Sequence, residues 1–159
     1  MKSAYRVLAL LVALGVVVQA GSIALAYFGL SKWIQDGGTL DKAGLEGGSV
    51  EFTGVIGFPI HFLNAYLIVL LALILLIISF FAKVSGGAKW AAFILLAVVV
   101  QILLGMLARS TPVLGALHGV NALIIFGLAV TAAMRVRRRD PAAVTHATSG
   151  TAPSERERV

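Results

Sequence analysis

The sequence predicts an all-α polytopic membrane protein, built as an up-down bundle of four helices. Of its 159 residues, 59% are hydrophobic and 13% are charged, and the mean hydropathy is +0.97. A soluble domain of this size cannot bury that much apolar surface. Four segments reach the length of about 20 apolar residues that spans a bilayer, at about 5–30, 54–82, 90–108 and 115–134. They form a transmembrane domain over 1–135.

The basic residues predict which helix ends face the cytoplasm. They cluster at 2–6, 83–89 and 135–139, whereas the 31–53 loop carries two lysines against four carboxylates. Because basic residues favour the cytoplasmic side, we expect a multi-pass plasma-membrane protein with both termini inside. Residues 136–159, basic and polar, are expected to be a disordered cytoplasmic tail.

The first helix has a second interpretation as a cleaved secretory signal peptide. Lys2 and Arg6 precede an apolar stretch, and Ala24-Leu25-Ala26 resembles a cleavage site. The apolar stretch is longer than the usual signal core of about 7–15 residues. We therefore expect the first helix to be a retained membrane span.

The two halves of the chain share a spacing of polar residues. Val16-Val17-Val18-Gln19 recurs as Val98-Val99-Val100-Gln101, and His-x-x-Asn-Ala occurs at 61–65 and at 118–122. Each half is therefore predicted to consist of a helix with a mid-membrane glutamine, an outer loop, and a second helix with a histidine near its start. We expect two tandem helical hairpins related by an axis along the membrane normal. The second and fourth helices are then parallel and diagonal.

His61 and His118 lie at matched depth, about one turn into the outer ends of two apolar helices. Ionisable side chains are rare in hydrocarbon and usually face a bundle interior or a site. Two opposed imidazoles are one arrangement of axial ligands for iron. The chain has no cysteine, which excludes iron–sulfur clusters and covalently attached c-type haem. Two histidines also fall short of the three or four protein ligands of zinc sites. We therefore expect a non-covalent haem b.

Seven further residues are expected to support this cofactor: Gln19, Gln101, Asn64, Asn121, Gly57, Gly115 and Arg109. The four amides are candidate acceptors for the second N–H of each imidazole, with a backbone carbonyl as the alternative. The two glycines let a flat macrocycle or a neighbouring backbone approach closely. The arginine ends the third span on the outer side, where it can pair with a haem propionate.

The predicted role is electron transfer or haem handling as an accessory subunit, rather than an enzyme. Protein ligands on both sides of the iron leave no position for a substrate. The expected partners are the lipid bilayer and a redox partner or larger membrane complex, and no nucleic acid. One alternative is a cofactor-free structural or assembly subunit, because polar side chains also join membrane helices. A small-solute permease is a third possibility, disfavoured by the absence of an intramembrane acid.

Part of the sequence resembles the haem A synthase family. The resemblance is carried by Gln101-Ile102-Leu103-Leu104-Gly105, Arg109, and Leu117-His118 with a small residue at Ala122. It is strongest over 98–125 and is echoed over 14–65. It implies that His61 and His118 correspond to the axial ligands of that family's haem b.

The chain also departs from that family. The family has eight helices, two histidine pairs and an outer-loop glutamate three residues before a histidine. This chain has four predicted helices and one pair, and the acid nearest before His61 is Glu51. The resemblance therefore implies haem ligation without the synthase reaction, in a half-size bacterial relative.

Overall fold

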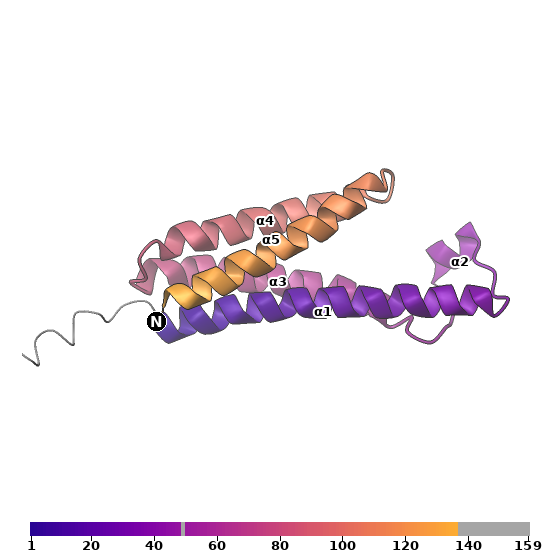
Figure 1. The fold of residues 1–159 in the computed structure, drawn as a ribbon, viewed down its shortest axis with the longest axis horizontal. Helices are drawn as coiled ribbons and strands as arrows, with labels where there is room; N and C mark the ends of the chain where they lie inside the picture. Colours follow the sequence, from indigo (N-terminus) through magenta and orange to yellow (C-terminus); the bar gives the residue numbers. More distant parts are fainter. Residues whose placement is uncertain (49, 137–159) are drawn as a thin grey trace, which may run out of the picture.

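The computed structural model describes residues 1–48 and 50–136, and within these residues it is helical with no strand. The long helices are α1 (Lys2–Gln35), α3 (Gly57–Phe81), α4 (Gly87–Leu107) and α5 (Val113–Arg135) (Figure 1). A short helix, α2 (Lys42–Gly47), lies between α1 and α3. Each long helix is long and apolar enough to cross a membrane. The predicted helical class and its four apolar spans are therefore confirmed. Most of the predicted tail, 137–159, lies outside the described residues.

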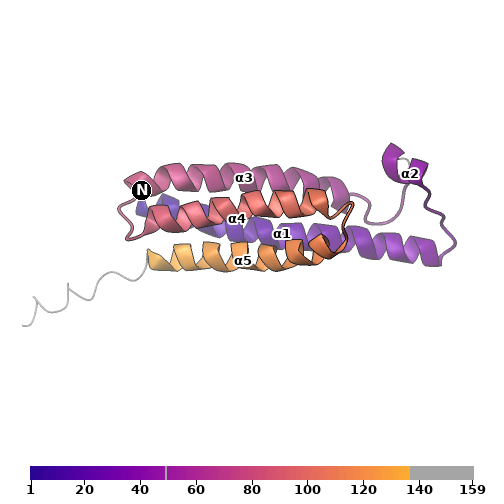
Figure 2. The same cartoon turned by 90° about the horizontal axis from the view of Figure 1, so that it is seen from above.

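The long helices form a ring in which each contacts two neighbours. α1 packs against α3 and α5, and α4 packs against the same two helices. The histidine-bearing helices α3 and α5 therefore lie across the bundle from each other. The N-terminus, the α3–α4 turn and the end of α5 lie together at one end of the bundle, hereafter the N-terminal end (Figures 1 and 2). The opposite end, near α2, is hereafter the α2 end.

The helices differ from their predicted bounds by a few residues, for local reasons. α1 runs on to Gln35 because no glycine or proline lies between its predicted end at residue 30 and Gly37, whose φ is +98°. Its 34 residues span about 51 Å at 1.5 Å per residue, so it projects beyond its neighbours at the α2 end (Figure 2). The short helix α2 was not predicted. It begins where the Asp41 carboxylate accepts a 2.7 Å hydrogen bond from the Gly44 N–H.

Small side chains fill the interior of the bundle, and large apolar side chains cover its outside. Eight alanines of the four long helices are buried in it: Ala9, Ala13, Ala26, Ala72, Ala91, Ala129, Ala132 and Ala133. Large side chains such as Phe28 (78% exposed) and Leu63 (73% exposed) point outward. Small residues at helix contacts are typical of membrane bundles, where lipid rather than water surrounds the outer face. The chain is therefore a multi-pass membrane protein whose outer face suits lipid.

The half of the bundle nearest the N-terminal end is tightly packed. Tyr5, Val12, Leu75 and Ile94 are all fully buried there. The Tyr5 hydroxyl donates a 3.1 Å hydrogen bond to the carbonyl of Gly87, which joins the start of α1 to the start of α4. The starts of α1 and α4 are therefore fixed against each other at this end.

Glycines bring the start of α3 against α1 in the α2 half. A Cβ atom added at Gly57 would collide with the carbonyl oxygen of Ser22 and lie 3.0 Å from the Ala26 nitrogen. Likewise, a Cβ at Gly29 would collide with the carbonyl oxygen of Thr53. Backbone therefore packs directly on backbone here, and this contact fixes the level of His61, one turn farther along α3.

Candidate ligand site between the membrane helices

Both histidine rings are held by main-chain carbonyls of a neighbouring helix. His61, in the first turns of α3, has its Nδ1 3.0 Å from the Gln19 carbonyl oxygen on α1. His118, in the first turns of α5, has its Nδ1 3.0 Å from the Gln101 carbonyl oxygen on α4. A carbonyl oxygen only accepts hydrogen bonds, so each Nδ1 carries the proton. In the singly protonated form of each ring, the lone pair is therefore on Nε2, the nitrogen available to a metal.

The asparagine one turn beyond each histidine holds the glutamine side chain. Asn64 Nδ2 donates to Gln19 Oε1 at 3.0 Å and to the Gly15 carbonyl at 2.8 Å. Asn121 Nδ2 donates to Gln101 Oε1 at 2.7 Å and to the Ala97 carbonyl at 2.9 Å. The same set of hydrogen bonds thus joins α3 to α1 and α5 to α4. The two sets use positions that the sequence repeat pairs with each other.

The two imidazoles face a shared space across the bundle. Their ring centroids are 6.3 Å apart, and the ring planes are inclined by 45°. A Cβ added at Gly105 would lie 3.0 Å from Cε1 of His118. This glycine therefore leaves room on α4 for the His118 ring.

A cavity of about 280 Å³ lies beside the two rings, lined by all four long helices. Its polar lining consists of His61, His118, Gln19 and Gln101. The rest of the wall is apolar and comes from Val16, Ala20, Ile23, Ala65, Ile68, Val98, Ile102, Gly119, Ala122, Leu123 and Ile125. Among the described residues, no group of three or more His, Cys, Asp or Glu side chains is placed to hold a metal ion. The cavity thus offers two imidazole nitrogens in apolar surroundings.

The structure brings some of the predicted site residues to this cavity and places others elsewhere. The two histidines and two glutamines line it, while Asn64 and Asn121 stand behind the glutamines. The predicted imidazole acceptor turns out to be the backbone carbonyl that the sequence left as an alternative.

The other three candidates do not line the cavity. Gly57 lies against the backbone of α1. Gly115 faces the α4–α5 turn, where a Cβ would lie 3.8 Å from the Ala108 Cβ. Arg109 is exposed, just past the end of α4.

Sequence reasoning did not single out Ala20 and Ala65 as lining residues. Ala65 follows His61 by one helical turn, and Ala20 adjoins Gln19. Small residues next to the polar positions were therefore an available signal. It is a weak one, because alanine is common throughout these helices.

Comparisons with protein-family models, with curated proteins and with solved structures gave no match to this chain.

The asparagine contacts yield a stability prediction. Replacing Asn121 with leucine should lower the free energy of unfolding by about 1 kcal/mol, because Gln101 Oε1 loses its donor inside the bundle. Asn64→Leu should act alike through Gln19. SDS titration in mixed micelles measures both effects. Gln35→Leu, at an exposed glutamine near the end of α1, is the control and should change stability by less than about 0.5 kcal/mol. Equal stability of Asn121→Leu and wild type would contradict the prediction.

Proposed function

We propose that this protein is a b-type haem protein of the membrane, with His61 and His118 as the two axial ligands. The observation that carries the proposal is the 6.3 Å between their ring centroids. Two nitrogen–metal bonds of about 2.0–2.1 Å, plus about 1.2 Å from each nitrogen to its ring centre, separate opposed imidazoles by roughly 6.4 Å. Donation from each Nδ1 to a carbonyl also fixes the tautomer that binds metal through Nε2.

The lining of the cavity beside the rings has the apolar character that a macrocycle needs, but the volume of the cavity is small for one. Its wall is apolar apart from the two histidines and two glutamines. Its volume of about 280 Å³ is just below the range of about 300–1,000 Å³ for small-molecule sites. A macrocycle therefore requires lining side chains to move. Leu123 is one that can, because it is 71% exposed.

The donor set favours electron transfer or haem handling over catalysis. Haem supplies a one-electron couple when bound. His61 and His118 would occupy both axial positions, so that no position stays open for a substrate. The apolar wall of Ile68, Val98 and Ile125 would exclude water from the metal. Electron transfer needs a second protein that supplies or takes up the electron, so the proposal includes an accessory role beside a redox partner or in a larger membrane complex.

The decisive experiment is an absorption spectrum of the full-length protein, purified after expression with added haem precursor. Low-spin bis-imidazole iron should give a sharp visible band on reduction, at about one haem per chain. Extraction and a pyridine assay of the pigment then identify haem b. A purified, folded protein without such a band after haem supplementation would overturn the proposal.

The second candidate is a cofactor-free structural or assembly subunit, and specific contacts favour it as well. Each histidine joins two neighbouring helices by a hydrogen bond. Among the described residues, every buried side-chain nitrogen or oxygen has a hydrogen-bond partner, so no polar atom there demands a ligand. This function predicts colourless protein and the same helix bundle.

The proposed topology is two tandem hairpins, α1–α3 and α4–α5, with both termini in the cytoplasm. The contacts of α1 with α3 and of α4 with α5 and the basic residues at the N-terminal end support it. A fluorescent protein fused at the C-terminus should fold and fluoresce, and a periplasmic phosphatase fused there should be inactive. The opposite pair of results would invert the topology and place the histidines toward the cytoplasmic leaflet.

A further inference from the structure

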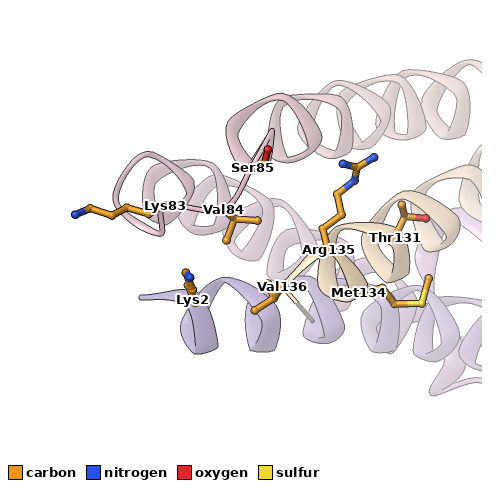
Figure 3. A pocket seen from close by; sticks show the side chains of 8 residues that line it. All are labelled: Lys2, Lys83, Val84, Ser85, Thr131, Met134, Arg135 and Val136. Atoms are coloured by element: carbon orange, nitrogen blue, oxygen red, sulfur yellow. The ribbon is translucent and has the colours of Figure 1, made fainter. Parts of the chain in front are cut away.

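A second cavity, of about 300 Å³, opens at the N-terminal end of the bundle. Three segments meet around it: the start of α1, the α3–α4 turn and the end of α5 (Figure 3). The residues that line it are Lys2, Lys83, Val84, Ser85, Thr131, Met134, Arg135 and Val136. The proposed haem site does not share any of them, so this cavity is a separate feature of the fold.

In the part of the chain that the structure describes, three positive charges surround the cavity and no carboxylate lines it. They come from Lys2, Lys83 and Arg135, and Figure 3 shows the two lysines on one side and the arginine on the other. In the described part of the chain, every acidic residue belongs to the segment between α1 and α3 or to the end of α1. That segment lies at the α2 end (Figure 1). Charges of one sign that line a cavity favour binding of an ion of the opposite sign.

The arginine is held in place by an aromatic ring. The guanidinium carbon of Arg135 lies 4.5 Å from the ring centroid of Trp90 on α4, which is a cation–π contact. A planar guanidinium fixed in this way keeps N–H donors free in a fork that matches the oxygens of a phosphate.

Lys83 occupies a backbone conformation that lysine rarely adopts. Its φ of +50° lies in the left-handed region, and it is the only described residue other than glycine with a positive φ. Glycine is the residue usually found at such a position directly after a helix. A lysine at this position accepts backbone strain and places a charge at the rim of the cavity.

The remaining lining residues combine hydroxyl and apolar groups. Ser85 and Thr131 offer hydroxyl groups, and Val84, Met134 and Val136 offer apolar surface. Lys2 begins α1 and Arg135 ends α5, so the cavity lies at the level where membrane helices leave the hydrocarbon. Phospholipid headgroups occupy that level, and basic pockets between membrane helices bind their phosphates.

We propose that this cavity binds the phosphate group of an anionic phospholipid. Arg135 and Lys83 contact the phosphate oxygens, and Lys2 supplies the third positive charge. The hydroxyl groups of Ser85 and Thr131 donate hydrogen bonds to the phosphate. The apolar lining residues contact the acyl chains next to the glycerol. Inorganic phosphate and soluble phosphate esters share this chemistry. The experiment must therefore separate a lipid from a soluble ligand.

The test is native mass spectrometry of the full-length protein in detergent, titrated with anionic phosphatidylglycerol or with zwitterionic phosphatidylcholine. Phosphatidylglycerol should bind more tightly. Lys83→Gly should weaken its binding about fivefold while leaving the fold intact, because glycine tolerates the positive φ. Arg135→Gln should act similarly. Lys89→Gln is the matched control: it removes a charge at the same end that does not line the cavity, and binding should stay within about twofold.

Each outcome decides one part of the proposal. Equal binding of the two lipids, together with binding of millimolar inorganic phosphate that is lost in Lys83→Gly, would overturn the lipid proposal and assign the site to a soluble phosphate ligand. Equal binding of the two lipids, together with no phosphate binding, would overturn the proposal. An equal loss in Lys89→Gln and Lys83→Gly would also overturn it, because surface charge alone would then account for binding.

Discussion

If the protein binds haem as proposed, replacing either His61 or His118 with alanine is expected to remove the low-spin haem spectrum completely. The two rings come from diagonal helices, and their centroids lie 6.3 Å apart, so neither can take over the position of the other. A single remaining ligand would leave an open coordination position on the iron among apolar side chains such as Ile68 and Ile125. The measurement is the reduced-minus-oxidised spectrum of each purified variant, together with its haem content.

Two controls separate loss of a ligand from loss of fold. His146→Ala, in the tail outside the described residues, should leave the spectrum unchanged. Added imidazole should partly restore the low-spin band in His118→Ala, because the cavity then has room for the free ligand. A His61→Ala or His118→Ala protein with the wild-type spectrum would exclude axial ligation by that residue.

Gly57→Ala, which adds one methyl group at the start of α3, is expected to lower the free energy of unfolding. The added Cβ would collide with the Ser22 carbonyl oxygen and crowd the backbone of Ala26. Main-chain atoms of a packed helix cannot rotate away, so α3 must move away from α1. Overpacking of this kind costs about 1–3 kcal/mol of unfolding free energy, and SDS titration in mixed micelles measures the loss.

The matched control for this change is Gly127→Ala in α5. Gly127 is also helical, and a Cβ there meets no atom within 4 Å. Alanine has the higher helix propensity, so this variant should be as stable as wild type or up to about 1 kcal/mol more stable. Similar losses in the two variants would show that the α1–α3 backbone contact is not tight.

The sequence was sufficient to predict the membrane class and the four apolar spans. Hydrocarbon forces each span to be a continuous apolar helix, and this signal survives without knowledge of tertiary contacts. The importance of Gln19, Asn64 and their counterparts Gln101 and Asn121 was also visible, because polar residues are costly in such segments. Their role differs from the predicted one: each asparagine donates to a glutamine side chain, and neither pair accepts from an imidazole through its side-chain oxygen.

The partners of these residues could not be predicted from the sequence. Whether the imidazole of His61 contacts a side chain or a carbonyl of α1 depends on the rotation and axial shift of α3 against α1. Both would have to be known to within a fraction of a helical turn. Gly57 illustrates the same limit: the sequence allowed contact with a macrocycle or with backbone, and the structure places it on the Ser22 carbonyl. The cavity at the N-terminal end joins Lys2, Lys83 and Arg135, whose convergence only the assembled bundle reveals.

The use of main-chain carbonyls to orient both imidazoles has a consequence for mutational tolerance. The main-chain carbonyl is the same whatever the side chain. Substitutions at 19 and 101 that preserve the helix therefore leave the acceptors of His61 and His118 in place. The position of each helix thus sets the ring orientation, while the glutamine side chains accept hydrogen bonds from the asparagines. In a saturation library scored for the spectrum of the proposed haem, many residues should therefore retain that spectrum at 19 and 101, and few should retain it at 61 and 118.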